Sequence, residues 1–316
     1  MRALGAAARD DRVVLVAALI AFVLLSVALH PVEAREAPRD MLVVADLRGG
    51  ALVLIDPTEP QSARRIPLPG GPHELLRLPD GRVAVSLEQT GQVAIVDLAT
   101  GEVRAHAVGG YPHGLALDRA GALLVTDRAA EAVRRFTFDP WVEQPSIPAA
   151  GWPHAVVVSE AGEVIVALAS ASAIQAGPVR LDAPALSETV AIAPDGRIAT
   201  AGAMDGVVAV FAPDGALLDR YEVGGRPVRV AFDATGTTLA VALSAAGAVA
   251  LIEGDTVRTV RVAGVPDGIA FSSDGARVYV SDVAGGYVTA VDVRAGAVAA
   301  VIAVGQGTGA ILATAD

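Results

Sequence analysis

GPHELLRLPDGRVAVSLEQTGQVAIVD, residues 71–97, contains the unit from which most of the chain is built. Its apolar residues form short alternating runs, and Pro-Asp-Gly at 79–81 and Thr-Gly at 90–91 separate them. Alternation with period two predicts β-strands, and Asp-Gly supplies the positive φ angles that tight hairpins need. A fourth run, 103–108, follows the next glycine turn. The pattern therefore predicts four antiparallel strands in about forty residues.

The same unit recurs along the whole chain after residue 41. Each copy begins at a Pro- or Gly-containing corner, and in all but the last the corner residue lies eight positions before the glycine of a turn. The corner residues are His73, His113, His154, Glu188, Val228, Asp267 and Thr308, at intervals of 40, 41, 34, 40, 39 and 41 residues. Such a period indicates a unit that stacks on its neighbours. The 34-residue interval predicts that the copy at 154–182 is short or distorted.

The two ends of the chain complete each other. Residues 42–68 contain the second, third and fourth strands of a unit, and 309–315 supply a lone first strand. Pairing them closes a ring and leaves no exposed strand edge. We therefore expect an all-β fold over 41–316, a seven-bladed β-propeller of four-stranded antiparallel blades in which the C-terminal strand completes the first blade.

Composition excludes several functions. The formal net charge is −11, all 24 basic residues are Arg, and the chain contains neither Lys nor Cys. An acidic surface repels nucleic acid, so no nucleic-acid partner is expected. The absence of Lys excludes Schiff-base chemistry, and the absence of Cys excludes disulfides and thiolate metal sites.

An almost unbroken apolar run, 13–29, follows a short segment that bears Arg2, Arg9 and Arg12. The run is longer than a typical signal-peptide core and shorter than a comfortable membrane span. We expect residues 1–34 to be either a signal peptide, cleaved after Ala34, or an uncleaved membrane anchor, with 35–40 as a linker. Both interpretations place the propeller in the periplasm or outside the cell, and the membrane is a partner only through an uncleaved segment.

Four consecutive corners carry side chains that can bind a metal ion. The first strand of a propeller blade is innermost, so the corner residue faces the mouth of the central channel. His73, His113, His154 and Glu188 are thus candidate ligands of a divalent transition metal such as Zn²⁺, Fe²⁺, Mn²⁺ or Cu²⁺. Glu188 is also a candidate general base and Asp267 an alternative acid or base. The alternative is that the histidines only line the channel and bond to the backbone.

Other residues are expected at the same mouth and form a candidate substrate-binding set. Two aromatic residues precede the Pro-His corners, two aspartates end second strands, and one arginine flanks the Val228 corner. They are Tyr111, Trp152, Asp127, Asp282 and Arg226. Packing between blades, loop capping and surface ion pairs are the alternative roles of these residues.

Val278-Tyr279-Val280-Ser281-Asp282, followed by Gly286-Tyr287-Val288-Thr289-Ala290-Val291-Asp292, resembles the YVTN-repeat family of β-propellers. The resemblance covers the repeats after the N-terminal segment. It implies the propeller fold and leaves function open, because such propellers host binding, lyase and lactonase roles.

Two functions follow as hypotheses. The first is an exported scaffold that binds a protein or a small molecule, favoured because no nucleophile elbow or phosphate loop is present. The second is a metal-dependent lyase, lactonase or hydrolase that uses the three histidines and Glu188 at the channel mouth.

Overall fold

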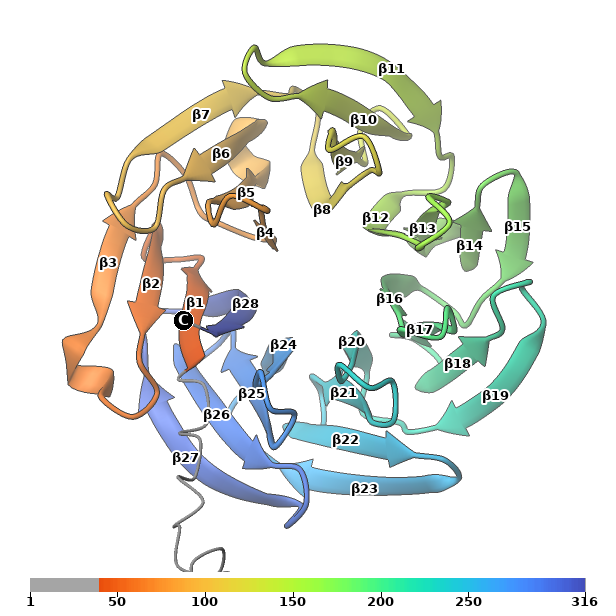
Figure 1. Ribbon diagram of the computed structural model, residues 1–316. Helices are drawn as coiled ribbons and strands as arrows, with labels where there is room; N and C mark the ends of the chain where they lie inside the picture. The colour runs from red at the N-terminus through yellow and green to blue at the C-terminus, as the bar shows by residue number, and fades with distance from the viewer. Residues whose placement is uncertain (1–39, 316) are drawn as a thin grey trace, which may run out of the picture. The chain divides into compact units, whose positions relative to one another are not determined.

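The structure, a computed structural model, describes residues 40–315. These residues form seven sheets of four antiparallel strands, arranged as blades around a central axis (Figure 1). The predicted all-β, seven-bladed propeller is confirmed. The predicted signal or anchor segment, 1–34, lies outside the described residues, and Asp40 of the predicted linker begins the first strand.

The strands are numbered in chain order and grouped here into blades 1 to 7. Blade 1 contains β28 (Thr308–Ala315), β1 (Asp40–Asp46), β2 (Ala51–Ile55) and β3 (Arg64–Pro67). Blade 2 contains β4 (Leu75–Arg77), β5 (Val83–Leu87), β6 (Gln92–Val96) and β7 (Val103–Ala107). Blade 3 contains β8 (Pro112–Leu117), β9 (Leu123–Asp127), β10 (Ala132–Thr137) and β11 (Val142–Pro148). Blade 4 contains β12 (Pro153–Val158), β13 (Val164–Leu168), β14 (Ala173–Ala176) and β15 (Val179–Asp182).

Blade 5 contains β16 (Ser187–Ile192), β17 (Ile198–Gly202), β18 (Val207–Phe211) and β19 (Leu217–Glu222). Blade 6 contains β20 (Pro227–Phe232), β21 (Leu239–Leu243), β22 (Ala248–Glu253) and β23 (Thr256–Arg261). Blade 7 contains β24 (Pro266–Phe271), β25 (Arg277–Asp282), β26 (Tyr287–Asp292) and β27 (Ala297–Ala303). The helical turns of the described chain are the 3₁₀ segments η1 (Pro60–Ser62), η2 (Glu88–Thr90) and η3 (Ala169–Ala171). None of its helices is long and apolar enough to cross a membrane.

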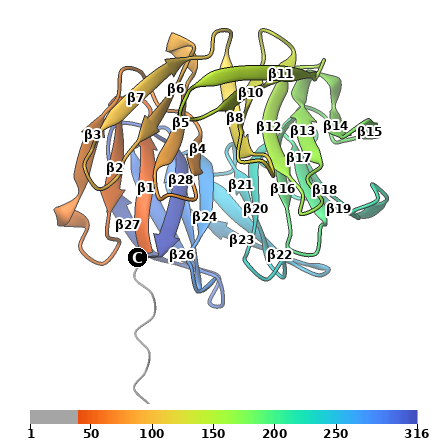
Figure 2. The same cartoon turned by 45° about the horizontal axis from the view of Figure 1, so that its top comes forward.

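The ring closes as the sequence predicts. Strand β28 pairs antiparallel with β1, with Leu42 opposite Ala313 and Val44 opposite Ile311. Figure 2 shows the two strands side by side within one blade. The last segment of the propeller thereby supplies the innermost strand of the blade that the N-terminal end of the propeller begins.

The innermost strands determine what faces the axis (Figure 1). Six of them, β8, β12, β16, β20, β24 and β28, lose register with their second strand close to the corner. A bulge of this kind leaves a residue unpaired and redirects its side chain. The corner residues of blades 3 to 7, His113, His154, Glu188, Val228 and Asp267, are therefore unpaired in the ladder.

Blade 4 is complete but short. Its third and fourth strands have only four residues each, and the two-residue turn Gly177-Pro178 joins them. The 34-residue interval in the sequence therefore reflects a shortened outer hairpin rather than a missing strand.

Apolar clusters between neighbouring blades form the core. Buried Val43 and Leu52 of blade 1, for example, join Val85 and Leu87 of blade 2 in one cluster. Most residues of the second and third strands are buried, and β5 and β21 are buried along their whole length. Both faces of these strands are covered by adjacent blades, so the stack of blades stabilises each member.

Candidate functional site

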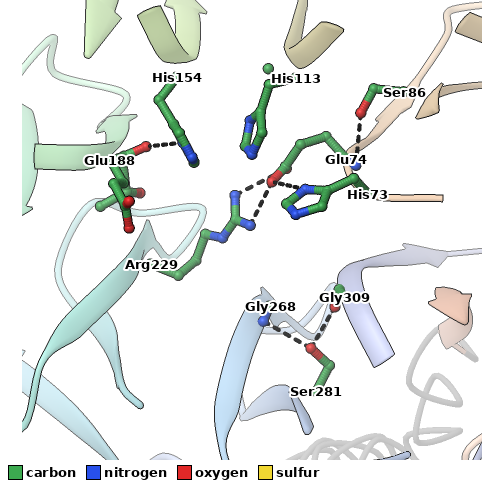
Figure 3. Close-up of polar contacts among 12 residues, drawn as sticks. His73, Glu74, Ser86, His113, His154, Glu188, Arg229, Gly268, Ser281 and Gly309 are labelled. Atoms are coloured by element: carbon green, nitrogen blue, oxygen red, sulfur yellow. Dashed lines mark hydrogen bonds and ion pairs between the residues drawn. The ribbon is translucent and has the colours of Figure 1, made fainter. Parts of the chain in front are cut away.

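Three histidines from consecutive blades lie side by side at the channel mouth (Figure 3). His73 precedes β4, and His113 and His154 are the second residues of β8 and β12. Ring centroids are 4.5 Å apart for His73 and His113, and 3.6 Å apart for His113 and His154. The equivalent positions of the repeat thus form one contiguous imidazole cluster.

A hydroxyl on the second strand connects each of several corners to the next blade. The Thr126 Oγ1 accepts a hydrogen bond from the Gly114 amide at 2.7 Å and donates one to the His154 carbonyl oxygen at 2.7 Å. Gly114 must be glycine because an added Cβ would lie 2.4 Å from that carbonyl oxygen. This contact fixes the corner that carries His154 relative to the strand that carries His113.

The same connection recurs in blade 7. There the Ser281 hydroxyl accepts from the Gly268 amide and donates to the Gly309 carbonyl oxygen (Figure 3). A Cβ on Gly268 would lie 2.5 Å from that oxygen. The arrangement is therefore a feature of the repeat, and blade 7 provides a comparison site that carries no histidine of its own.

The ligand atoms that converge are those of His73, Glu88 and His113. One ligand atom from each lies within 4.8 Å of those of the other two. The Glu88 Oε1 is 3.3 Å from the His113 Nε2 and 3.9 Å from the His73 Nδ1. Glu88 begins η2, directly after the second strand of blade 2, and its side chain is 11% exposed.

Three buried polar atoms in this group have no hydrogen-bond partner within residues 40–315. They are the His73 Nδ1, the His113 Nδ1 and the Glu88 Oε1. Buried polar atoms are nearly always bonded, since an orphaned one costs free energy. Two of them, the His73 Nδ1 and the Glu88 Oε1, lie 3.9 Å apart, whereas His113 approaches Glu88 through its other nitrogen, Nε2. The group therefore has hydrogen-bonding capacity that the described side chains leave unfilled.

His154 and Glu188 are joined in a different way from that predicted. The His154 Nδ1 lies 2.7 Å from the main-chain carbonyl oxygen of Glu188. Because a carbonyl only accepts, the hydrogen is on Nδ1, and Nε2 of the neutral ring is the free acceptor. Neither residue belongs to the converging group. Glu188 therefore contacts the cluster through its backbone, and its role as a ligand or base stays a prediction.

A salt bridge crosses the channel beside the histidines. Glu74 and Arg229 occupy the position after the corner in blades 2 and 6, and the Arg229 Nη1 and Nη2 lie 3.0 Å and 2.6 Å from the Glu74 carboxylate oxygens. The Glu74 Oε1 is also 3.5 Å from the His73 Nδ1. Because both ends of the pair are largely buried, removal of either would leave an uncompensated charge in the channel.

The surroundings set different protonation states for the three rings. Burial, together with the neighbouring His154 and His73, holds the pKa of His113 well below its usual value, and burial lowers the pKa of His154 to about 3. Burial also disfavours the charged form of His73, but Glu74, Glu88 and Asp267 outweigh it and raise its pKa. Two rings are therefore neutral at pH 7, which is the form that binds a metal.

The charges of the ion pair are stabilised in the same way. Burial alone would raise the pKa of Glu74, but Arg229 and the nearby histidines hold it well below its usual value. The carboxylate is therefore ionised, and it compensates the cation of Arg229 in the channel.

A pocket of about 230 Å³ adjoins the cluster. The carboxylates of Glu188 and Asp267 accept no side-chain or backbone hydrogen bond from residues 40–315, although their charges act on Arg229. The predicted substrate residue Arg226 is also in the wall. The lining consists of His73, His154, Glu188, Arg226, Val228, Arg229, Ser244, Val265, Pro266, Asp267 and Val283.

Tyr111 and Trp152 form an exposed rim above the histidines. They are 37% and 48% exposed, and the Arg128 guanidinium lies 4.8 Å and 5.6 Å from their ring centroids. A hydrogen bond to Glu88 and the charge of that carboxylate raise the pKa of Tyr111. Trp152 has a φ of 62°, which is strained for a bulky residue. Both aromatic side chains are thus available at the mouth, and Tyr111 contacts the converging group.

The predicted substrate residues Asp127 and Asp282 are buried behind the corners of blades 3 and 7. Asp127 accepts hydrogen bonds from the amides of Tyr111, Ala129 and Ala130, and Asp282 accepts from Val265, Ala284 and Gly285. These bonds hold the corner and the following loop together, as expected from the loop-capping interpretation. A direct contact with a substrate stays a prediction for both.

Glu88 is the residue that the sequence interpretation missed. It follows Leu87, the end of the second strand, and that strand runs back toward the histidine face. Its position was therefore accessible from the repeat. Only the turn geometry of η2 shows that its carboxylate bends toward the channel.

Comparisons with known proteins identify the fold and no family. No family model matches the chain, and no curated protein matches it. A functionally unknown protein from Desulfotomaculum acetoxidans DSM 771 superposes with a TM-score of 0.75 at 11% identity, over 87% of this chain and 99% of that chain. A putative 6-phosphogluconolactonase from Bacteroides fragilis NCTC 9343 gives 0.73 at 13%, over 90% and 100%. Virginiamycin B lyase from Staphylococcus aureus gives 0.66 at 13%, over 78% and 92%. At these identities the likeness shows the propeller fold alone.

Proposed function

We propose that this chain is an exported propeller of the YVTN-repeat type that binds a small molecule at its histidine-bearing mouth with the help of a divalent transition metal. The observation that carries the metal is the convergence of His73, Glu88 and His113, together with the orphaned His73 Nδ1 and Glu88 Oε1. Export is supported by the apolar segment 13–29 and by the absence of Cys. The family assignment is supported by the repeat motif in blade 7.

The donor set fits such an ion. Two imidazoles and a carboxylate suit Zn²⁺, Fe²⁺ or Mn²⁺ and leave positions open for a ligand. Ligand atoms about 2.1 Å from a tetrahedral ion are roughly 3.4 Å apart. The His113 Nε2 and the Glu88 Oε1, 3.3 Å apart, already have this separation. The free Nε2 of neutral His154 is a further candidate ligand after a small movement of its ring.

A metal-dependent lyase, lactonase or hydrolase is the second candidate. The observation that favours it is the 230 Å³ pocket, which places the carboxylates of Glu188 and Asp267 beside His73 and His154. A bound metal would polarise a carbonyl or activate water there. Among the solved structures of the same fold, one is named as a lyase and one as a putative lactonase, which is consistent with this reading.

Metal titration tests the proposal. We expect the metal-free chain to bind one equivalent of Zn²⁺ or Co²⁺ in isothermal titration calorimetry. His73→Ala and Glu88→Gln should each weaken binding by at least tenfold, because each removes a ligand. His106→Ala is the matched control, because His106 stacks on Trp141 in an outer strand and should leave binding unchanged.

Two results would contradict the proposal. One is the absence of stoichiometric binding in the folded wild-type chain. The other is equal loss of binding in the His106 control. If metal binds, a screen of lactones and activated esters with the loaded protein separates the two candidates, since only the enzyme turns them over.

A further inference from the structure

A large pocket lies away from the histidines, at the opposite ends of the inner strands. It has a volume of about 660 Å³, in the range of small-molecule sites. Blades 4, 5 and 6 form it together. The walls come from Val158, Ser159, Glu160, Ala161, Glu163, Ile165, Ile192, Ala193, Pro194, Asp195, Gly196, Ile198, Pro213, Phe232, Asp233 and Ala234.

The outer turns show where the pocket is walled. In blades 2, 3 and 7 the turn between the third and fourth strands adds an apolar side chain to the cluster shared with the preceding blade, as Leu98, Trp141 and Val293 do. The corresponding turn between blades 4 and 5 is 212–216 of blade 5, and it adds no side chain to the cluster that contains Ile165 and Ile198. Its Pro213 lines the pocket instead.

Acidic groups surround the opening. Glu160 and Glu163 line the pocket and form no close ion pair with any residue between 40 and 315, although the Arg119 side chain packs on Gly162 in the same turn. Asp195 pairs with Arg197 at 2.7 Å, and the Asp233 carboxylate accepts from the Thr238 amide and from a hydroxyl in its own turn. Negative charge over an apolar floor favours cations that carry hydrocarbon.

The cation beside the aromatic wall is already engaged. The Arg197 guanidinium bonds to Asp195 and to the Gly236 carbonyl oxygen, and it lies 5.5 Å from the ring centroid of Phe232. It therefore covers one face of the aromatic wall and cannot neutralise the free carboxylates on the side of blade 4.

We propose that this pocket is a second ligand site, for an apolar molecule with a cationic ammonium group. The hydrocarbon part packs on Ile165, Ile192 and Phe232, and the ammonium group lies between Glu160 and Glu163. The site is independent of the metal centre, because it shares no residue with the histidine cluster or its pocket.

Matched probes test the charge preference. Calorimetry or ligand-observed NMR compares octyltrimethylammonium, octanoate and octanol on the wild-type chain below their aggregation concentrations. We expect the cation to bind at least tenfold more tightly than either of the others. The double variant Glu160→Gln/Glu163→Gln should weaken the cation by about three- to tenfold, since exposed ion pairs are individually weak.

Two variants locate the site. Ala234→Trp places a large side chain at an exposed position of the wall, so it should abolish binding without disturbing the core. Glu59→Gln/Asp255→Asn removes two charges outside the pocket and should leave the affinity within about twofold. The proposal is overturned if the cation does not bind, if octanoate binds equally well, or if Ala234→Trp binds like the wild type.

Discussion

His113 and His154 are in ring contact, which is tolerable only because both rings are neutral. Their depressed pKa values follow mainly from burial, and the rings reinforce each other. His73, with Glu74 beside it, has the opposite shift. The cluster therefore contains one histidine with a raised pKa, His73, and two with lowered pKa values, His113 and His154.

Acid should begin to destabilise the metal-free chain at a higher pH than protonation of its carboxylates alone would. In the unfolded chain all three histidines titrate near pH 6.5. His113 and His154 have lowered folded pKa values, so their contribution is complete above pH 6.5 and is lost as the pH falls toward 3. Each contributes a slope of up to about 1.4 kcal/mol per pH unit. His73 has a raised folded pKa, so its contribution to the free energy of unfolding is complete below pH 6.5. That contribution is lost as the pH rises through the raised folded pKa.

Urea midpoints at pH 7 and pH 5, measured with chelator, check this balance. The losses at His113 and His154 outweigh the gain at His73, so the wild-type urea midpoint should be lower at pH 5 than at pH 7. His154→Gln should show a smaller fall. Identical pH dependence in the two proteins would mean that His154 titrates normally in the fold.

At the scale of the element, the bulge in β8 both packs against the next blade and carries His113. Gly114→Ala should destabilise the chain by about 1–3 kcal/mol, because its Cβ would meet the backbone of the next blade. It should also weaken metal binding, because the bulge that carries His113 must shift. Chemical denaturation and Co²⁺ titration measure the two effects.

Gly268→Ala is the control for that prediction. It creates a similar contact in blade 7, which carries no histidine, although Ala310 of the displaced segment donates a hydrogen bond to the His73 carbonyl oxygen. We expect a similar loss of stability with a smaller loss of Co²⁺ affinity, because no ligand side chain lies on the bulge that shifts. If Gly114→Ala affected metal binding no more than Gly268→Ala, the corner would have no positioning role.

The repeat predicted the elements well and the side-chain partners only in part. Turn glycines and period-two runs specify strands locally, so the strands of blade 2 and the closing role of 309–315 follow from sequence. The convergence on Glu88 depends on the turn of η2, and the Glu74–Arg229 pair joins residues 155 positions apart across the channel. Neither contact leaves a periodic signal.

At the scale of the whole molecule, closure of the ring is the main constraint on stability. Stopping the chain after Gly307 removes β28, which leaves β1 as an exposed edge and uncovers blade 1. We expect loss of the cooperative unfolding transition and aggregation. Circular dichroism melts and size-exclusion chromatography compare this variant with one that ends at Ala315, which should behave like the full chain. A folded monomer without β28 would contradict the closure.

Anomalous diffraction from a crystal of the Zn²⁺-loaded chain, collected on both sides of the zinc edge, tests the metal centre most directly. We predict one strong peak at the channel mouth, about 2.0–2.2 Å from nitrogen atoms of His73 and His113 and from a carboxylate oxygen of Glu88. A peak coordinated instead by the Glu188 carboxylate, or no peak at the mouth, would contradict this account.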